Sequence, residues 1–106
     1  MLNITDLQNL CRDDSMAITK HARQRLVERG ISIDDVQNAI RTGELIKQYE
    51  DDKPFPSCLL LGQTEQKVKI HVVVSTDNEF LYIITAYHPN EKEWESDLKT
   101  RKVEQS

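Results

Sequence analysis

The pattern of apolar positions changes near the middle of the chain, from a helical period to a strand period. Between residues 18 and 43, apolar residues recur three or four positions apart. Thr19 is suited to cap a helix that runs from Lys20 to Glu28 or Arg29, and Gly30 follows where a left-handed residue ends such a helix. This pattern predicts an amphipathic helix with Ala22 and Leu26 on its buried side.

A second helix is predicted directly after the first. Ser32 is a good N-cap residue, and Asp35 stands three positions later in a variant of the capping box. Val36, Ala39 and Ile40 form the apolar stripe. Gly43 is expected to end this helix.

Alternation of apolar and polar positions dominates after residue 43. Val68, Ile70, Val72 and Val74 fall on one face of a strand, which is the period of a half-buried sheet. Prolines and acidic residues over 51–56 indicate a loop, and residues 76–79 indicate a hairpin turn. The predicted strands cover 44–49, 57–62, 68–75 and 80–87.

Both ends of the chain carry weaker patterns. Residues 6–12 suggest a short amphipathic helix. Trp94 and Leu98 stand four apart, which predicts a C-terminal helix over 91–101. We expect one domain over residues 1–106, with an extension or short helix at 1–17, a core at 18–101 and a frayed tail at 102–106.

These elements predict an α+β fold: two or three N-terminal helices, then a four-stranded antiparallel sheet, then a C-terminal helix. Short connections favour antiparallel pairing between strands that follow each other in sequence. The helices should cover one face of the sheet. The other face, with Leu60, Val73, Tyr82 and Ile84, is then expected to form a groove or a dimer interface.

Composition narrows the class of protein further. The chain has 106 residues, of which 38% are hydrophobic and 30% charged, as in ordinary globular domains. No strongly apolar run exceeds three residues, and no secretory signal peptide is visible, so we expect a cytoplasmic protein without a membrane span. Cys11 and Cys58 lie outside any zinc or redox spacing, which predicts two free thiols. We expect neither a metal nor a cofactor.

The charge is unevenly distributed. The chain carries 14 Lys and Arg against 18 Asp and Glu, a formal net charge of −4. Residues 18–30 nevertheless hold four basic residues against the single acid Glu28, for a local charge of +3. His21, Arg25 and Arg29 are four apart and share one stripe of the predicted helix.

Two interpretations of this basic helix remain open. Its arginines could pair with carboxylates at 34–35 or 50–52, since guanidinium groups pair readily with carboxylates. Alternatively, the guanidinium groups could hold a phosphate while His21 moves protons. Two further histidines are less informative: His71 is expected to be packed within a strand, and His88 to be exposed at a strand end.

The basic helix also carries a resemblance to a known family. Residues 21–32, with the spacing His-x-x-x-Arg-x-x-x-Arg-Gly-Ile-Ser, and residues 83–89, Ile-Ile-Thr-Ala-Tyr-His-Pro, resemble the domain-of-unknown-function family 4258. This resemblance implies a branch of the RelE-like and colicin-type RNase fold, whose members are often toxins that cleave RNA without metal. The family's characteristic His and two Arg correspond to His21, Arg25 and Arg29. The chain departs from such RNases in being acidic overall.

The expected function is a metal-independent endoribonuclease of the RelE-like toxin type, or an inactive relative. His21 would be the base or acid, Arg25 and Arg29 would hold the phosphate, and Tyr87 would orient substrate or donate a proton. The expected nucleic-acid contacts are Lys20, Arg23, Lys69 and His71.

The alternative is a non-catalytic domain that binds a protein or dimerises through its free sheet face. The expected partners are therefore RNA, an antitoxin or other protein, or a second copy of the chain.

Overall fold

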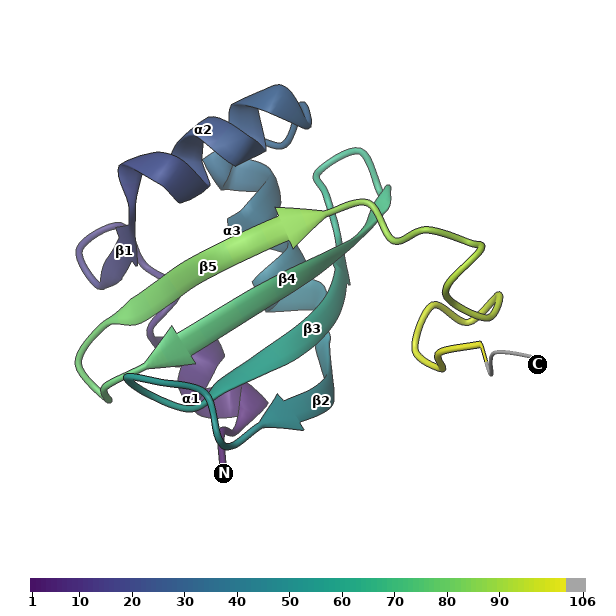
Figure 1. Ribbon diagram of the computed structural model, residues 1–106. Helices are drawn as coiled ribbons and strands as arrows, with labels where there is room; N and C mark the ends of the chain where they lie inside the picture. The colour runs from purple at the N-terminus through teal and green to yellow at the C-terminus, as the bar shows by residue number, and fades with distance from the viewer. Residues whose placement is uncertain (103–106) are drawn as a thin grey trace.

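The computed structural model describes residues 1–102 and shows three short helices packed on one face of a five-stranded mixed sheet (Figure 1). The strand order is β1-β5-β4-β3-β2. The helices are α1 (Ile4–Asn9), α2 (Lys20–Glu28) and α3 (Ile33–Thr42), and the strands are β1 (Met16–Ile18), β2 (Glu44–Tyr49), β3 (Ser57–Gln63), β4 (Lys69–Thr76) and β5 (Leu81–Tyr87). None of the described helices is long and apolar enough to span a bilayer.

Local capping explains both longer helices, as the sequence predicts. The Thr19 hydroxyl accepts a hydrogen bond from the backbone N–H of Ala22 at the start of α2. Ser32 and Asp35 form a reciprocal capping box at the start of α3. Gly30 adopts a φ of +69°, so the left-handed turn between the helices is confirmed.

The antiparallel part of the sheet is also confirmed. β2, β3, β4 and β5 pair in sequence order, and each begins and ends within one residue of its predicted bounds. Strand β4 lies at the centre, with Ile70, Val72 and Val74 facing the helices. These residues form the main core together with apolar residues of α2 and α3.

The predicted four-stranded antiparallel sheet is wrong because a fifth strand joins it. Residues 16–18 form β1, which pairs parallel to β5 with Ile18 opposite Ile83. The sequence pattern placed residues 16 and 17 in the N-terminal extension or short helix and Ile18 at the start of the core, and predicted no strand here. A strand of three residues is too short to show alternation, and its parallel partner is distant in sequence.

The predicted C-terminal helix is also wrong. Residues 88–102 contain turns and one isolated bridge between Trp94 and Arg101, with no helix. Asp97 accepts hydrogen bonds from the backbone N–H groups of Lys99 and Thr100, and Leu98 has a φ of +60°, so the backbone turns here. The frayed tail predicted for 102–106 lies, beyond residue 102, outside the described residues.

One residue predicted for the free sheet face belongs to the other side. Leu60 is fully buried in the core beneath the helices, where it pairs across the ladder with Val72. Leu59 and Leu61 are buried but do not belong to the core beneath the helices. The run from Cys58 to Leu61 is apolar throughout, so the sequence has no alternation from which to assign the faces.

Close packing between α3 and β3 depends on Gly62. A Cβ atom at this position would overlap the carbonyl oxygen and Cα of Ala39 in α3. We therefore expect Gly62→Ala to lower the free energy of unfolding by about 3 kcal/mol, because backbone atoms cannot yield locally. Denaturant titration would measure this change.

Gly30→Ala is the matched control for this prediction. A Cβ at Gly30 meets nothing within 4 Å, so only its positive φ resists the substitution. The expected loss is about 1 kcal/mol. Equal losses in the two variants would show that the Gly62 contact does not limit packing.

Candidate functional site

The outer edge of α2 carries the stripe predicted from the sequence. Ala22 and Leu26 are buried against the core, whereas His21 and Arg25 are exposed. Arg29 is the C-cap residue of this helix and continues the same stripe. His21 and Arg29 are two helical turns apart, about 12 Å along the axis, so the stripe is long enough to meet neighbouring phosphates of an extended strand.

Arg29 fixes the end of this stripe to the sheet. Its Nη1 donates to the Thr85 hydroxyl and to the Ala86 carbonyl oxygen, each at 2.9 Å. The pairing of β1 with β5 ends at Ile83, so these groups lie beyond the short edge strand. The guanidinium group therefore satisfies part of the sheet edge and is held in one place by it.

The cations of α2 are not neutralised by neighbouring acids. Within residues 1–102, the single ion pair joins Lys99 to Glu44 of β2, the strand at the opposite edge of the sheet from α2 and β1. No carboxylate lies within salt-bridge distance of Arg23, Arg25 or Arg29 in this part of the chain. The contacts predicted by the first interpretation, with residues 34–35 or 50–52, are not formed.

A shallow apolar recess lies beside the start of α2. It has a volume of about 350 Å³ and is formed where β1 ends against β5. Its lining residues are Ala17, Ile18, Thr19, Tyr82, Ile83 and Ile84. An apolar surface next to exposed cations is the combination that single-stranded nucleic acids use, with stacked bases and paired phosphates.

The remaining predicted basic contacts do not join this stripe. Lys20 is exposed at the first position of α2. Arg23 lies on another side of the helix, beside a small recess that also involves Asp13 and Gln37. Lys69 is exposed at the start of β4. The structure therefore brings together His21, Arg25 and Arg29. Lys20, Arg23 and Lys69 lie outside this stripe.

Tyr87 and His71 lie together on the sheet face opposite the helices. They are paired across the β4–β5 ladder, and their rings meet edge to face at 5.4 Å between centroids. The Tyr87 hydroxyl is 3.4 Å from His71 Nδ1. The hydrogen-bond partner of the Tyr87 hydroxyl is therefore His71 on the sheet, and within residues 1–102 no hydrogen bond joins Tyr87 to His21 or Arg29.

The hydrogen bonds of His71 define its tautomer. His71 Nε2 is 2.8 Å from the Leu98 carbonyl oxygen, which can only accept, so Nε2 carries the proton. Nδ1 is then the acceptor for the Tyr87 hydroxyl. Burial lowers the pKa of His71, partly offset by the Leu98 hydrogen bond, and burial raises the pKa of Tyr87. Both groups are therefore neutral near pH 7.

The C-terminal segment, residues 88–102, is the cause of this burial. The Trp94 ring packs edge to face on His71 at 4.6 Å, and the Arg101 guanidinium lies 5.3 Å from the Trp94 ring centroid. Lys99 pairs with Glu44 of β2 at 3.2 Å. Trp94 and Leu98 were expected in a helix, and nothing in their spacing indicates that they cover a histidine. The sequence predicted His71 to be packed, but not what covers it.

The other reactive side chains offer little chemistry. Cys11 and Cys58 are free thiols, as predicted, and both are buried. Burial raises the pKa of the Cys58 thiol to about 12. This thiol stays protonated and is a poor nucleophile. His88 is exposed, in agreement with its position at the end of β5. Within residues 1–102, no group of three or more His, Cys, Asp or Glu side chains is arranged to hold a metal ion.

Comparison with known proteins identifies the family. The family model described as "Domain of unknown function (DUF4258)" matches residues 18–88, and the chain belongs to this family. The match includes the α2 stripe and Tyr87, whereas Trp94 and Leu98 lie beyond it. No curated protein and no solved structure matches the chain.

The two arginines of the stripe should differ in their effect on stability. Arg29→Ala removes both hydrogen bonds to the edge of β5, and we expect it to lower the free energy of unfolding by about 1 kcal/mol. Arg25→Ala removes an unpaired cation beside other cations, so the melting temperature should stay unchanged or rise slightly. Thermal unfolding of both variants would measure this. An equal loss in Arg25→Ala would contradict the assignment of Arg25 as a free ligand group.

The contact between the C-terminal segment and His71 should be sensitive to acid. The pKa of buried His71 lies below its ordinary value of 6.5, so the proton binds more tightly when the segment is released. The contact is therefore fully stable above about pH 6.5 and loses stability as the pH falls through 6.5 towards the lowered pKa. Trp94 is the only tryptophan, so a red shift of its emission on acidification would report release.

His71→Gln provides the control, because glutamine can still donate to the Leu98 carbonyl but does not titrate. We expect its emission to change much less between pH 8 and pH 5, each curve being compared with its own value at pH 8. Identical acid responses in the wild type and the variant would assign the change to another group.

Proposed function

We propose that this domain binds single-stranded RNA along the outer edge of α2 and cleaves it without a metal ion. One observation carries the proposal: an acidic protein with a net charge of −4 presents His21, Arg25 and Arg29 in one stripe with no carboxylate partner among residues 1–102. Unpaired cations repel one another at four-residue spacing, which a helix needing only stability would avoid. An anionic ligand would remove this repulsion.

The position of Arg29 favours a phosphate ligand in particular. Thr85 and Ala86 hold one guanidinium nitrogen, Nη1, which leaves the remaining N–H donors of the group without a hydrogen bond within residues 1–102. A guanidinium group that is already oriented loses little entropy when it binds a phosphate oxygen. Arg25, one turn earlier, can meet the same phosphate or the preceding one. The recess beside Thr19 would accept a base.

His21 supplies the proton chemistry in this proposal. Its neutral imidazole would take the proton from a ribose 2′-hydroxyl, whose oxygen then attacks the neighbouring phosphorus. The bond from phosphorus to the 5′-oxygen breaks, and that oxygen takes a proton from the imidazolium or from water. The products are a 2′,3′-cyclic phosphate and a 5′-hydroxyl end. Arg25 and Arg29 would stabilise the negative charge that builds up on the phosphate oxygens.

Tyr87 has a different place from the one expected. Its hydroxyl donates to His71 on the opposite face, so it is not free to donate to a phosphate held on α2. Its contribution would be to position the end of β5, to which Arg29 is bonded. Cleavage rather than binding alone is supported by the likeness of the DUF4258 family to the RelE-like and colicin-type RNases, and not by the sheet topology.

A second candidate function is protein binding at the sheet face opposite the helices. Ile84 is 45% exposed and Phe55 is 39% exposed on this side, beside a cavity of about 430 Å³. In this alternative the domain is not catalytic, and the α2 stripe serves only for solubility or for a weak anion contact. Salt dependence separates the two, because counterion release accompanies phosphate binding but not apolar docking.

RNA binding and cleavage can be tested with purified protein, single-stranded RNA and excess chelator. We expect affinity to fall steeply as salt rises from about 50 to about 200 mM, with a log–log slope of roughly −0.7 for each phosphate neutralised. The double variant Arg25→Ala/Arg29→Ala should bind at least tenfold more weakly, since it loses about two charge-assisted contacts. His21→Ala should bind nearly as well as the wild type and cleave at least a hundredfold more slowly, the usual scale of a lost general base.

His88→Ala is the matched control, since His88 is also exposed but lies outside the stripe. It should cleave like the wild type. Cleavage by His21→Ala at the wild-type rate would remove His21 from the mechanism. Binding without any cleavage by the wild type would overturn the enzymatic part of the proposal, and affinity indifferent to salt and to both arginines would overturn the whole of it.

A further inference from the structure

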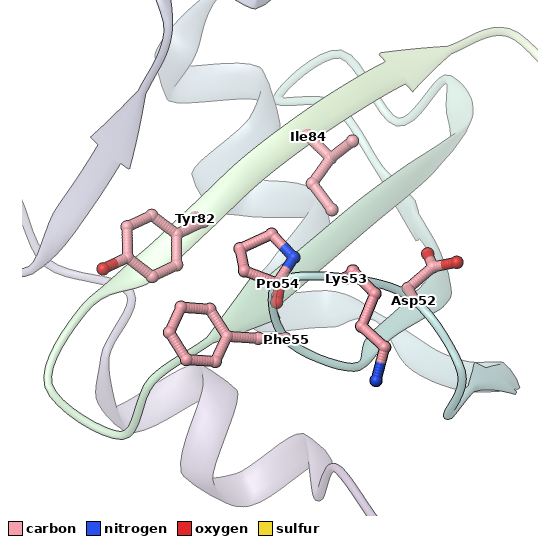
Figure 2. Close-up of a pocket in the computed structure, with 7 residues that line it drawn as sticks. Asp52, Lys53, Pro54, Phe55, Tyr82 and Ile84 are labelled. Carbon is pink, nitrogen blue, oxygen red and sulfur yellow. The ribbon is translucent and has the colours of Figure 1, made fainter.

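The sheet face opposite the helices holds a second cavity, formed between the β2–β3 loop and strand β5 (Figure 2). Its volume is about 430 Å³, and its lining residues are Asp52, Lys53, Pro54, Phe55, Ser75, Tyr82 and Ile84. Most of this lining is apolar or aromatic. It lies at the start of β5, whereas His71 pairs with Tyr87 at the end of that strand. None of its lining residues belongs to the α2 stripe or to the C-terminal segment.

Two aromatic rings form one side of the cavity. The rings of Phe55 and Tyr82 are nearly parallel, at 4°, with centroids 6.2 Å apart. Figure 2 shows them side by side with their faces turned the same way, next to Pro54. They therefore present two parallel aromatic faces, and Ile84 adds an aliphatic wall beside them.

Acidic groups surround this surface. The two loops that border it, residues 51–56 and 77–80, contain four carboxylates and one ammonium group, Lys53. Figure 2 shows Lys53 on the far side of Pro54 from the two rings. The excess of negative charge would repel the phosphates of RNA and attract a cation.

Tyr82 is directly coupled to this acidic border. Its hydroxyl donates a 2.6 Å hydrogen bond to the Asp77 carboxylate. That bond, together with those from the backbone N–H groups of Phe80 and Glu79, lowers the pKa of Asp77 and keeps it ionised. Donation to a carboxylate makes the phenol ring richer in electrons, which strengthens its attraction for a cation on its face.

We propose that this cavity docks an arginine side chain of a basic partner polypeptide, with the guanidinium plane stacked on Phe55 and Tyr82. The guanidinium group is flat and weakly hydrated, so it stacks on aromatic rings better than the compact ammonium of lysine. Its aliphatic stem would lie against Ile84, and the carboxylates of both loops complement its charge. The inference rests on the second candidate function, protein binding at this face. Tyr82 and Ile84 also line the recess beside Thr19, whereas Phe55 lines this cavity and not that recess.

The test uses a short blocked peptide with two arginines separated by glycines, and its counterparts with lysine or with citrulline in place of arginine. Citrulline keeps the planar shape and loses the charge. Backbone amide signals of the full chain, followed by NMR during titration, should move at Phe55, Tyr82 and Ile84 with the arginine peptide. We expect affinity about fivefold lower for the lysine peptide and lower still for the citrulline peptide.

Phe55→Leu and Phe80→Leu form the matched pair of variants. Phe80 is 41% exposed, close to the 39% of Phe55, and belongs to the neighbouring hairpin but does not line the cavity. Phe55→Leu should weaken the arginine peptide about fivefold, whereas Phe80→Leu should leave its affinity unchanged. Both residues are on the surface, so both variants should fold.

Several outcomes would overturn the inference. Equal binding of the arginine and citrulline peptides would leave apolar docking possible but remove the guanidinium. Shifts produced by oligouridylate at Phe55, which does not line the recess beside Thr19, would assign the surface to RNA. Self-association of the wild type that Phe55→Leu abolishes would assign it to a second copy of the chain. No shift with any peptide would overturn both the inference and the second candidate function.

Discussion

The unequal pairing of β5 determines where this molecule can bind anything. One edge of β5 is hydrogen-bonded to β4 over its whole length, whereas the other edge is paired with β1 over three residues only. The unpaired part of that edge needs donors, and Arg29 supplies them to Thr85 and Ala86. This bond fixes α2 beside the sheet edge, and α2 in turn presents His21 and Arg25 to solvent. The same short pairing leaves the recess at Thr19 and exposes Ile84.

The two faces of the sheet are covered by different parts of the chain. Helices cover one face and create a continuous apolar core. The opposite face is covered only in part: residues 88–102 bury His71 under Trp94, and the β2–β3 loop places Phe55 beside Tyr82. The buried imidazole of His71 is tolerated because both of its nitrogens have hydrogen-bond partners, the Leu98 carbonyl and the Tyr87 hydroxyl. The part of this face that lies between residues 88–102 and the β2–β3 loop is the surface available to a partner.

Much of this fold follows from local signals in the sequence. Thr19, Ser32 and Gly30 mark helix ends by hydrogen bonding and backbone freedom, and the alternation in β4 gives the central strand. What the sequence misses depends on contacts between distant residues. β1 forms only because β5 offers an edge. Residues 91–101 leave their predicted helix because Trp94 packs on the His71 ring and the Leu98 carbonyl accepts a hydrogen bond from His71. Neither partner is visible in the local pattern of the segment that uses it.

The candidate site shows the same division. The α2 stripe could be predicted, because residues four apart on a helix must share a side whatever the surrounding fold. Whether its arginines pair with acids could not be predicted, since that depends on where the first turn of α3, with Asp34 and Asp35, and residues 50–52 lie in the fold. No ion pair joins them to the α2 arginines within residues 1–102. Tyr87 was grouped with the stripe through its place at the end of β5, yet the pleat of the strand turns it towards His71. A residue one position along a strand changes face, so adjacency in sequence to a functional edge is poor evidence for membership of a site. For this chain, the cationic edge on α2 and the acidic aromatic surface on β5 are built from different side chains. They approach each other at Tyr82 and Ile84, which line both the recess beside Thr19 and the cavity at Phe55.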